Sequence, residues 1–257
     1  MTATVPVVKM NGTHNEFVIV DARRDELADP VGFARRVCDR TTGIGADGLL
    51  LLLASAGADA RLRIINADGS EAEMCGNGMR CVARYLDEHD GRERAIVETV
   101  AGPIATQIVS REPYTVAEVL GTPEIGTPHI VAGFEAIPVD VGNPHVVIAV
   151  ADLAAIDAAT LGPRIERDPR YPAGTNVHFV QRAGEELRVV HWERGAGATA
   201  ACGTGAVACA AVAVECWGYR SPVTVHVPGG TLRVEFVPGA PATLIGDAVT
   251  EFSTTFA

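Results

Sequence analysis

Two kinds of hydrophobic periodicity divide the chain into predicted strands and helices. Apolar and polar residues alternate between 95 and 109 and again between 223 and 236, with Gly102 or Gly229 interrupting the alternation. Both stretches are therefore predicted to form β-hairpins. Before each hairpin lies an apolar run of helical period that ends at a glycine, as helices commonly do.

The two helical runs carry the same motif, which indicates an internal duplication. Cys75 and Cys202 each begin a Cys-Gly-x-Gly frame, and the glycine predicted to end the helix follows 16 residues later in both cases. Upstream, the strand-like segment 62–65 is matched by 187–190. We therefore predict two domains of one fold, each with the order strand, helix, strand, strand, cysteine helix and hairpin.

The composition is typical of a folded intracellular protein. Of the 257 residues, 47% are hydrophobic and 21% charged, and the length is enough for two domains. The net charge of −11 argues against nucleic acid as a partner, because phosphate binding depends on clustered Lys and Arg. We find neither a secretion signal nor an apolar run of the roughly 18 residues that cross a membrane. We expect a cytoplasmic protein with no membrane partner and, as the default oligomer, a homodimer.

The six cysteines are expected to be thiols, because a chain with an ample core needs no disulfide. Cys38, Cys81, Cys209 and Cys216 fall inside helical patterns, where cysteine usually packs as a small buried apolar residue. The seven-residue spacing that links Cys202, Cys209 and Cys216 is wider than that of zinc ligand pairs. We therefore predict no metal site.

Cys75 and Cys202 differ from the other cysteines because each directly precedes a predicted helix. A thiol at a helix N-terminus lies beside unpaired backbone N–H groups and the positive end of the helix dipole, which favour the thiolate. The same N–H groups can bind a carboxylate, and the glycines allow close approach of a ligand. Each frame thus offers a base together with an anion site.

A pair of such thiols suits the inversion of a stereocentre beside a carboxylate. One thiolate would remove the α-proton while the opposing thiol delivers a proton to the other face, and the roles exchange in the reverse direction. The helix N-termini would stabilise the charge that develops on the carboxylate. This scheme requires no cofactor.

Two glycine-rich segments do not fit a nucleotide site. Residues 43–48 match G-x-G-x-x-G, but a helical pattern precedes them and a strand follows, the reverse of the dinucleotide-binding order. Residues 195–200 are interpreted instead as the loop that presents Cys202. The chain has no GxxxxGK[ST] motif.

Eight ordered motifs, spread over nearly the whole chain, resemble those of the diaminopimelate epimerase family. They are Asn15-Glu16-Phe17-Val18, Gly43-Ile44-Gly45-Ala46-Asp47-Gly48, Asn66-Ala67-Asp68-Gly69-Ser70, Met74-Cys75-Gly76-Asn77-Gly78, Gly142-Asn143-Pro144-His145, Gly174-Thr175-Asn176-Val177, Glu193-Arg194-Gly195 and Ala201-Cys202-Gly203-Thr204-Gly205. The resemblance implies an isomerase, independent of pyridoxal phosphate, that interconverts LL- and meso-2,6-diaminoheptanedioate on the way to lysine and peptidoglycan precursors.

The resemblance also implies a role for each motif residue. Cys75 and Cys202 would be the paired base and acid, assisted by His145 and Glu193. The non-reacting end of the substrate would be bound by polar side chains: Asn15, Asn66, Asn143, Asn176 and Arg194. Glu193 would also contact the substrate. Backbone N–H groups would hold the reacting carboxylate, at Gly76, Asn77, Gly203 and Thr204.

The implied fold is α/β (α+β), with two pseudo-symmetric domains. Each domain is a mixed, curved sheet wrapped around a central helix, and the active site lies in the cleft between them. We expect the domains to comprise 1–120 plus about 247–257, and 121–246, with a hinge within 121–138.

The sequence departs from the family pattern at four positions. Asn11 stands where the family's usual first motif begins with a histidine. Glu16 replaces aspartate, Gly48 stands where some members have a glutamine that contacts substrate, and Ala198 replaces a common glutamate before the second cysteine.

Two other interpretations remain open at this stage. One is a related cofactor-free racemase, such as a proline or hydroxyproline epimerase, or an isomerase of the same fold. The other is a redox protein in which Cys75 and Cys202 form a reversible disulfide, although the chain has no Cys-x-x-Cys motif.

Overall fold

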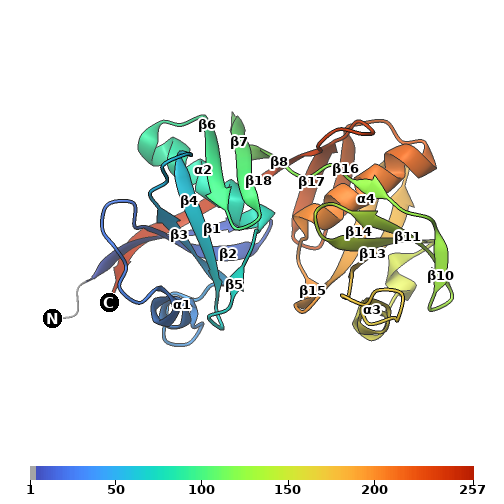
Figure 1. Cartoon of the computed structure of the whole chain (residues 1–257), viewed down its shortest axis with the longest axis horizontal. Helices are drawn as coiled ribbons and strands as arrows, with labels where there is room; N and C mark the ends of the chain where they lie inside the picture. Colours follow the sequence, from blue (N-terminus) through green and yellow to red (C-terminus); the bar gives the residue numbers. More distant parts are fainter. Residues whose placement is uncertain (1–3) are drawn as a thin grey trace. The chain divides into compact units, whose positions relative to one another are not determined.

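The computed structural model describes residues 4–257 and divides into two compact units (Figure 1). The first comprises Met1–Glu118 and Gly246–Ala257, of which 1–3 lie outside the described residues, and the second comprises Val119–Ile245. Residues 121–138, where we expected a hinge, belong to the second unit and contribute two short strands and the start of a third.

Strands outnumber helices in both units. The first contains β1 (Val5–Gly12), β2 (Asn15–Asp21), α1 (Pro30–Cys38), β3 (Gly48–Leu53), β4 (Ala60–Asn66), β5 (Glu71–Ala72), α2 (Gly76–Asp90), β6 (Arg94–Thr99), β7 (Gly102–Arg111), β8 (Tyr114–Val119) and β19 (Val249–Phe256). The second contains β9 (Glu124–Ile125), β10 (His129–Val131), β11 (Phe134–Asp140), β12 (Pro144–Val150), the 3₁₀ turn η1 (Leu153–Ala155), α3 (Ala158–Glu166), β13 (Asn176–Ala183), β14 (Glu186–Glu193), β15 (Gly197–Thr199), α4 (Gly203–Trp217), β16 (Val223–Val227), β17 (Gly230–Glu235) and β18 (Thr243–Asp247).

The strand pairings repeat from one unit to the other, which confirms the predicted duplication. In the first unit β2 runs parallel to β3, β3 pairs antiparallel with β4, and β4 runs parallel to β6. Strands β12, β13, β14 and β16 pair in the same order and directions. The final strand, β19, pairs with β1 of the first unit. The expected mixed α/β fold class is thus confirmed.

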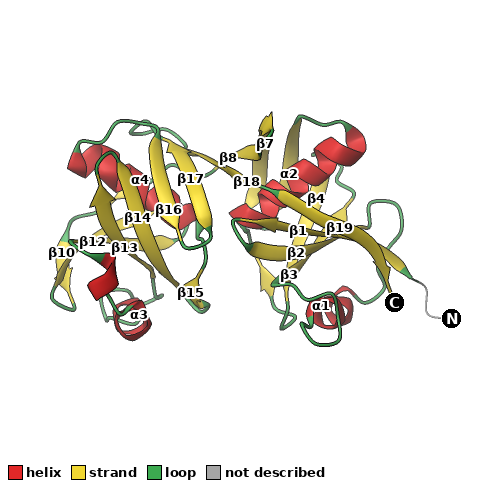
Figure 2. Cartoon of the chain, turned by 180° about the vertical axis from the view of Figure 1, so that it is seen from behind, coloured by secondary structure: helices red, strands yellow, loops and turns green. Residues whose placement is uncertain are grey.

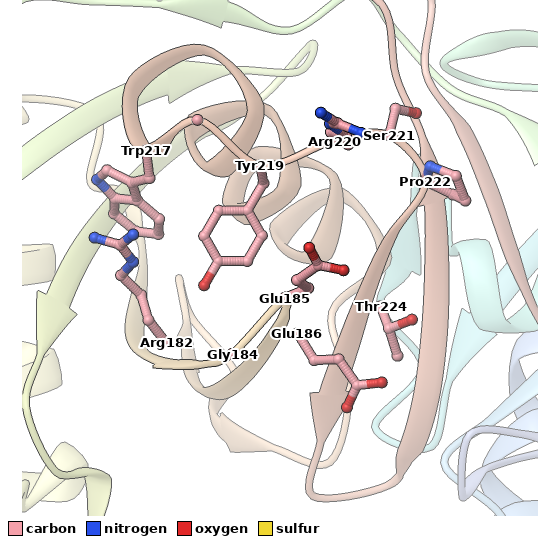
Figure 3. A pocket seen from close by; sticks show the side chains of 11 residues that line it. Arg182, Gly184, Glu185, Glu186, Trp217, Tyr219, Arg220, Ser221, Pro222 and Thr224 are labelled. Carbon is pink, nitrogen blue, oxygen red and sulfur yellow. The ribbon is translucent and has the colours of Figure 1, made fainter.

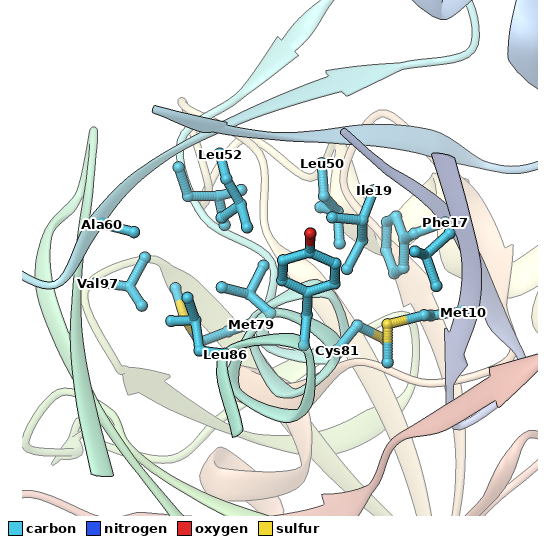
Figure 4. Packing of buried hydrophobic residues seen from close by; sticks show 14 of the residues in the cluster. Met10, Phe17, Ile19, Leu50, Leu52, Ala60, Met79, Cys81, Leu86 and Val97 are labelled. Carbon is cyan, nitrogen blue, oxygen red and sulfur yellow. The ribbon is translucent and has the colours of Figure 1, made fainter. Parts of the chain in front are cut away.

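One long helix packs against the sheet in each unit (Figures 1 and 2). In the first unit α2 contacts β1, β2, β6 and β7, and Met79, Cys81 and Leu86 meet the sheet residues in Figure 4. Helix α1 covers the opposite face of the sheet through Phe33 and Val37. Strand β3 therefore has apolar side chains on both faces, which explains its run of five leucines.

The two long helices begin and end as predicted. Cys75 is the N-cap of α2 and Cys202 is the N-cap of α4, and both have extended backbone. The helices end at Gly91 and Gly218, which adopt left-handed φ angles of 69° and 75° that glycine takes without steric cost. Each cysteine is therefore held at the start of a helix of 15 residues.

The other cysteines differ in exposure. Cys38, Cys81 and Cys209 are buried, as predicted. Cys216 is exposed, so the prediction of a buried position is wrong there: it lies in the last turn of α4, which extends beyond the buried part of the helix. Among the described residues, no helix is long and apolar enough to cross a membrane.

Candidate active site

Cys75 stands at the N-terminus of α2, ahead of the first intrahelical hydrogen bond. The first intrahelical hydrogen bond runs from Met79 N–H to the Cys75 carbonyl at 2.8 Å, so the N–H groups of 76–78 precede the first helical bond. A Cβ at Gly76 would lie 2.8 Å from Oε1 of Glu118, so a side chain at this position would clash. The glycine thus allows the helix start to lie against Glu118.

Asn15 joins Cys75 to the first turn of α2. Its Oδ1 accepts hydrogen bonds from the Cys75 thiol at 3.7 Å and from Asn77 Nδ2 at 3.4 Å. Its Nδ2 donates to Asp47 Oδ2 at 2.7 Å, which fixes the orientation of the amide. The structure therefore brings together three of the predicted site residues, which we name the Cys75 cluster: Cys75, Asn15 and Asn77.

Arg80 contacts the Cys75 cluster through Asn77. Its side chain is fully buried, donates to Asn77 Oδ1 at 2.7 Å and forms an ion pair with Glu118 at 3.0 Å. It also bonds Thr13 Oγ1 and the Asp247 carbonyl. Arg80 was not among the residues predicted from the sequence, because a single arginine in a helical pattern is usually exposed.

The remaining predicted residues of the first unit make other contacts. Asn66 lies at the turn from β4 to β5, where its Nδ2 donates to Ser70 Oγ at 2.9 Å. Glu16, the departure from the family pattern, forms ion pairs with Lys9 and Arg40. Gly48 is the first residue of β3, and a Cβ there would lie 3.1 Å from the Ile65 carbonyl oxygen.

Cys202 at the start of α4 lies beside a carboxylate. The Cys202 thiol lies 3.7 Å from Thr204 Oγ1 and close enough to Glu193 for each group to shift the pKa of the other. Burial raises the pKa of the Cys202 thiol well above its usual range, and the Glu193 charge raises it further; the Gly205 N–H and the Thr204 hydroxyl act in the opposite direction. At neutral pH this cysteine is therefore a protonated thiol.

Glu193 reaches Cys202 from the end of β14. Its Oε1 accepts a hydrogen bond from Thr199 Oγ1 at 2.5 Å. Burial raises the pKa of Glu193, while the bonds from Thr199 and Cys202 lower it. Ala198, another departure from the family pattern, lies between Gly197 and Thr199 in the short strand β15, which pairs with the end of β14. Strand β15 occupies part of the segment that we expected to be a loop.

A row of three buried histidines lies beside Cys202. His145 Nε2 lies 2.8 Å from Asn143 Oδ1, and its Nδ1 lies 2.8 Å from His178 Nε2. His178 Nδ1 lies 2.7 Å from His191 Nδ1. We name these residues the histidine chain: His145, His178 and His191, ending at Asn143. Burial lowers the pKa of His145 and His191 to about 3 and that of His178 well below its usual value, so all three rings are neutral at pH 7.

The histidine chain also brings metal-ligating atoms close together. Ligand atoms of His145, His178 and Cys202 lie within 4.8 Å of one another. Both nitrogens of His145 and of His178 are already within hydrogen-bonding distance of a partner, so a metal would have to displace one of these bonds. The grouping is therefore better explained by hydrogen bonding.

Asn176 connects the loops that carry the other predicted residues. Its Nδ2 donates to the Pro144 carbonyl at 2.9 Å, and its Oδ1 accepts the Arg194 backbone N–H at 3.0 Å. The exposed Arg194 guanidinium donates to the Ala173 carbonyl at 3.0 Å. Asn176 thereby fixes Arg194 relative to the residues next to Pro144, namely Asn143 and His145.

A separate pocket of about 660 Å³ lies at the other end of α4 (Figure 3). Arg182 lies 5.8 Å from the Trp217 ring and 5.5 Å from the Tyr219 ring. Helix α4 is roughly 20 Å long at about 1.5 Å per residue, so this pocket is distant from Cys202. It contains none of the site residues predicted from the sequence.

Acid is expected to destabilise the second unit through the histidine chain. The folded rings stay neutral while the unfolded chain binds protons below pH 6.5, so the free energy of unfolding falls as pH falls. Between pH 7 and 5 the loss is about 2 kcal/mol for each such histidine. Replacing His191 with isoleucine should reduce the loss by about that amount, as measured by denaturation at both pH values.

Tryptophan fluorescence reports this transition, because both tryptophans, Trp192 and Trp217, lie in the second unit. Burial raises the pKa of Glu118 to about 7, so acid stabilises the first unit through this residue. Wild type and His191→Ile share this contribution, so it drops out of the difference between them. If the free energy of unfolding falls equally in wild type and in His191→Ile between pH 7 and pH 5, the prediction is wrong.

Comparison with known proteins identifies the family. Proteins named diaminopimelate epimerase are 42% identical in Desulfitobacterium hafniense, over 90% of both chains, and 43% identical in Moorella thermoacetica, over 90% of this chain and 91% of the relative. Solved structures share the fold: a phenazine biosynthesis protein of the PhzF family from Bacillus anthracis has a TM-score of 0.71 at 16% identity, covering 100% of both chains, and a hydroxyproline epimerase from Agrobacterium vitis has 0.69 at 16%, covering 98% of this chain and 91% of that one.

The family's own sequence model, described as diaminopimelate epimerase, matches residues 7–126 and 137–250. With this match and with relatives above 40% identity along nearly its whole length, the chain belongs to the diaminopimelate epimerase family.

Proposed function

We propose that this protein epimerises diaminopimelate, interconverting the LL and meso forms, with Cys75 and Cys202 as its two proton-transferring groups. The observation that carries the proposal is the duplication itself: each unit places a cysteine at the N-cap of a 15-residue helix, followed by glycine. Family membership supplies the substrate class. The activity is that of an isomerase.

The two cysteines are suited to different halves of one turnover. Cys202 is a protonated thiol at rest, because burial and the neighbouring Glu193 charge keep its pKa high. In one direction Cys75 first releases its thiol proton to solvent and, as the thiolate, takes the α-proton while the C–H electron pair moves into the substrate carboxylate. The pair then returns to the α-carbon as the Cys202 thiol protonates the other face. Glu193 stabilises Cys202 as the thiol until it delivers this proton. The reverse direction exchanges the two roles.

The charge that develops on the substrate carboxylate needs donors aimed at it. In both units the N–H groups of the first helical turn precede the first intrahelical bond, which Met79 makes in α2 and Ala206 makes in α4 at 2.9 Å. We infer that the backbone N–H groups at Gly76, Asn77, Gly203 and Thr204 bind this carboxylate. The helix dipoles favour the negative charge in the same way.

The non-reacting end of the substrate carries a second carboxylate and ammonium group. Arg194 suits the carboxylate, because its exposed guanidinium makes only one side-chain hydrogen bond among the described residues, to Ala173. Asn176 holds the Arg194 backbone in place. We propose that Arg194 and Asn143 contact this end directly, whereas Asn176 acts by fixing their loops.

Incubation with LL-diaminopimelate in deuterated water, with reductant present, tests the function. We expect the meso form to appear and deuterium to accumulate at the α-carbon. Proline and trans-4-hydroxyproline serve as alternative substrates in parallel reactions. Absence of α-deuteration with diaminopimelate would refute the proposal, and turnover of proline alone would replace it with a different racemase. The homodimer and the cytoplasmic location stay predictions.

A further inference from the structure

The histidine chain occupies a layer that is entirely apolar in the first unit. In the paired strands His145 lies opposite Asn176 and His178 opposite His191, while in the first unit Phe17 lies opposite Gly48 and Leu50 opposite Ile64. Ile64 and His191 each precede the cysteine of their unit by 11 residues (75 − 64 and 202 − 191). The three histidines therefore correspond to Phe17, Leu50 and Ile64.

The two layers support the cysteine helices in the same way. A Cβ at Gly78, three residues after Cys75, would lie 3.0 Å from Leu50 Cδ2. A Cβ at Gly205, three residues after Cys202, would lie 2.3 Å from His178 Cε1. The first turn of each helix thus packs directly on the middle residue of its layer, which is leucine in one unit and histidine in the other.

An apolar layer is sufficient to build this fold, because the first unit has one. Burying imidazole rings instead requires every ring nitrogen to find a partner. In the second unit the rings satisfy one another, and of their six ring nitrogens only His191 Nε2 has no hydrogen-bond partner among the described residues. The polar layer therefore points to a role other than packing.

The chain of hydrogen bonds has one favoured direction. Each neutral ring carries one N–H donor and one acceptor nitrogen, so the proton position on one ring sets that on the next. A buried N–H without an acceptor is rarer in proteins than an unpaired acceptor, so the unpartnered His191 Nε2 is the acceptor. His191 Nδ1–H then donates to His178, His178 Nε2–H to His145, and His145 Nε2–H to Asn143 Oδ1.

This direction fixes the amide of Asn143. Because Oδ1 accepts from His145 at 2.8 Å, the amide cannot rotate to exchange oxygen and nitrogen without losing that bond. Asn143 Nδ2 makes no other hydrogen bond among the described residues and keeps two N–H donors for a ligand. The opposite direction would turn the carbonyl oxygen toward the ligand and repel a carboxylate.

We propose that His178 and His191 are positioning residues: through the tautomer of His145 they orient Asn143 to donate its amide N–H groups to a carboxylate of the substrate. The inference rests on the proposed function only for the identity of that substrate. His145 has both nitrogens engaged in this arrangement, so it acts on Asn143 rather than as a base toward Cys202.

The direction of the hydrogen bonds can be measured without any activity. Long-range ¹⁵N spectra of the histidine rings in the wild-type protein at pH 7 should show the N–H at Nε2 of His145 and His178 and at Nδ1 of His191. An N–H at Nδ1 of His145 would overturn the proposal. If the wild type fails to epimerise diaminopimelate, the proposed function fails, while these spectra still decide the direction.

Two substitutions at His178 test the consequence for substrate. His178→Leu installs the residue of the first unit and removes the donor to His145, so KM for diaminopimelate should rise about five- to tenfold, as expected for the loss of one oriented hydrogen bond. Because the contact is to the non-reacting end, kcat should change much less. His178→Gln keeps an amide N–H in place of Nε2–H and should keep KM within about twofold of wild type.

Stability measurements on wild type, His178→Leu and His178→Gln show whether a change in KM comes from the orientation of Asn143 or from a loss of folded protein. Tryptophan fluorescence should show that all three proteins unfold at a similar denaturant concentration, because leucine fits the same layer in the first unit. If His178→Leu fails to fold, His191→Ile replaces it in the test. This variant removes the donor that sets the proton position on His178, so the His145 ring should carry its proton on either nitrogen and KM should rise. Equal KM values in wild type and in whichever of these two apolar variants folds would overturn the proposal.

Discussion

Replacing Cys75 or Cys202 with serine is expected to lower kcat for epimerisation by about a thousandfold or more. Every turnover needs one group to remove the α-proton and another to supply a proton on the opposite face, and a serine hydroxyl is too weakly acidic to do either at neutral pH. A thousandfold change corresponds to about 4 kcal/mol in the activation free energy. The rate of appearance of the meso form, measured for both variants, checks the prediction.

Cys216→Ser is the matched control for these variants. Cys216 is exposed in the last turn of α4, almost four helical turns from Cys202, and makes none of the contacts of the candidate site. Its replacement should leave kcat unchanged. If either Cys75→Ser or Cys202→Ser keeps more than a tenth of the wild-type kcat, the two-thiol mechanism is wrong.

Replacing Arg80 with methionine should lower the free energy of unfolding of the first unit by about 3–5 kcal/mol. Arg80 and Glu118 are both fully buried, and Glu118 Oε2 has no other partner among the described residues. Methionine leaves that carboxyl group without its counter-ion. Burial already raises the pKa of Glu118 to about 7, so the destabilisation should be larger at pH 8 than at pH 6, where the proton can bind.

Circular dichroism during denaturation follows both units, and tryptophan fluorescence gives the second unit as an internal reference. The double variant Arg80→Met/Glu118→Gln should recover part of the loss, because no buried charge remains. Arg92→Ala breaks an exposed ion pair with Asp59 in the same unit and should cost at most about 1 kcal/mol. A loss below about 1 kcal/mol for Arg80→Met would contradict the assignment of Arg80 as the support of Asn77.

Local signals in the sequence were sufficient for much of the fold. The start of each cysteine helix follows from a Cys-Gly-x-Gly frame, and its end follows from a glycine with a left-handed φ angle. These features depend on hydrogen bonds within a few residues, so the chain encodes them directly. The short strand β15 was missed because its three residues pair only once β14 is in place beside them.

The candidate site was predictable in part. Repeated motifs identified Cys75 and Cys202, and the structure places Asn15 against the first and Glu193 against the second. The structure also gives Asn176 a use that residue type alone does not reveal, because both ends of its amide bind backbone groups of other strands and loops. Such contacts depend on which strands become neighbours.

The hydrogen bonds of the histidine chain could not be predicted from local sequence patterns. Histidine at 191 stands where the repeat has isoleucine, and that mismatch in an apolar strand pattern was the available signal. The bonds themselves join residues 33 and 13 positions apart in the sequence, so they exist only when β12, β13 and β14 take their observed register. A shift of one residue would turn these side chains to the other face of the sheet.

The sequence by itself therefore determined the duplication, the repeated cysteine motif, the helices that carry it and the family. The tertiary structure decided what surrounds each cysteine helix start: Asn15 against Cys75 and a buried arginine against Asn77 in one unit, a carboxylate and a row of histidines near Cys202 in the other. The physical reason is the range of the interactions. Helix caps and periodicity act over a few residues, whereas the acidity of a thiol and the orientation of an amide depend on burial and on partners brought in by distant strands.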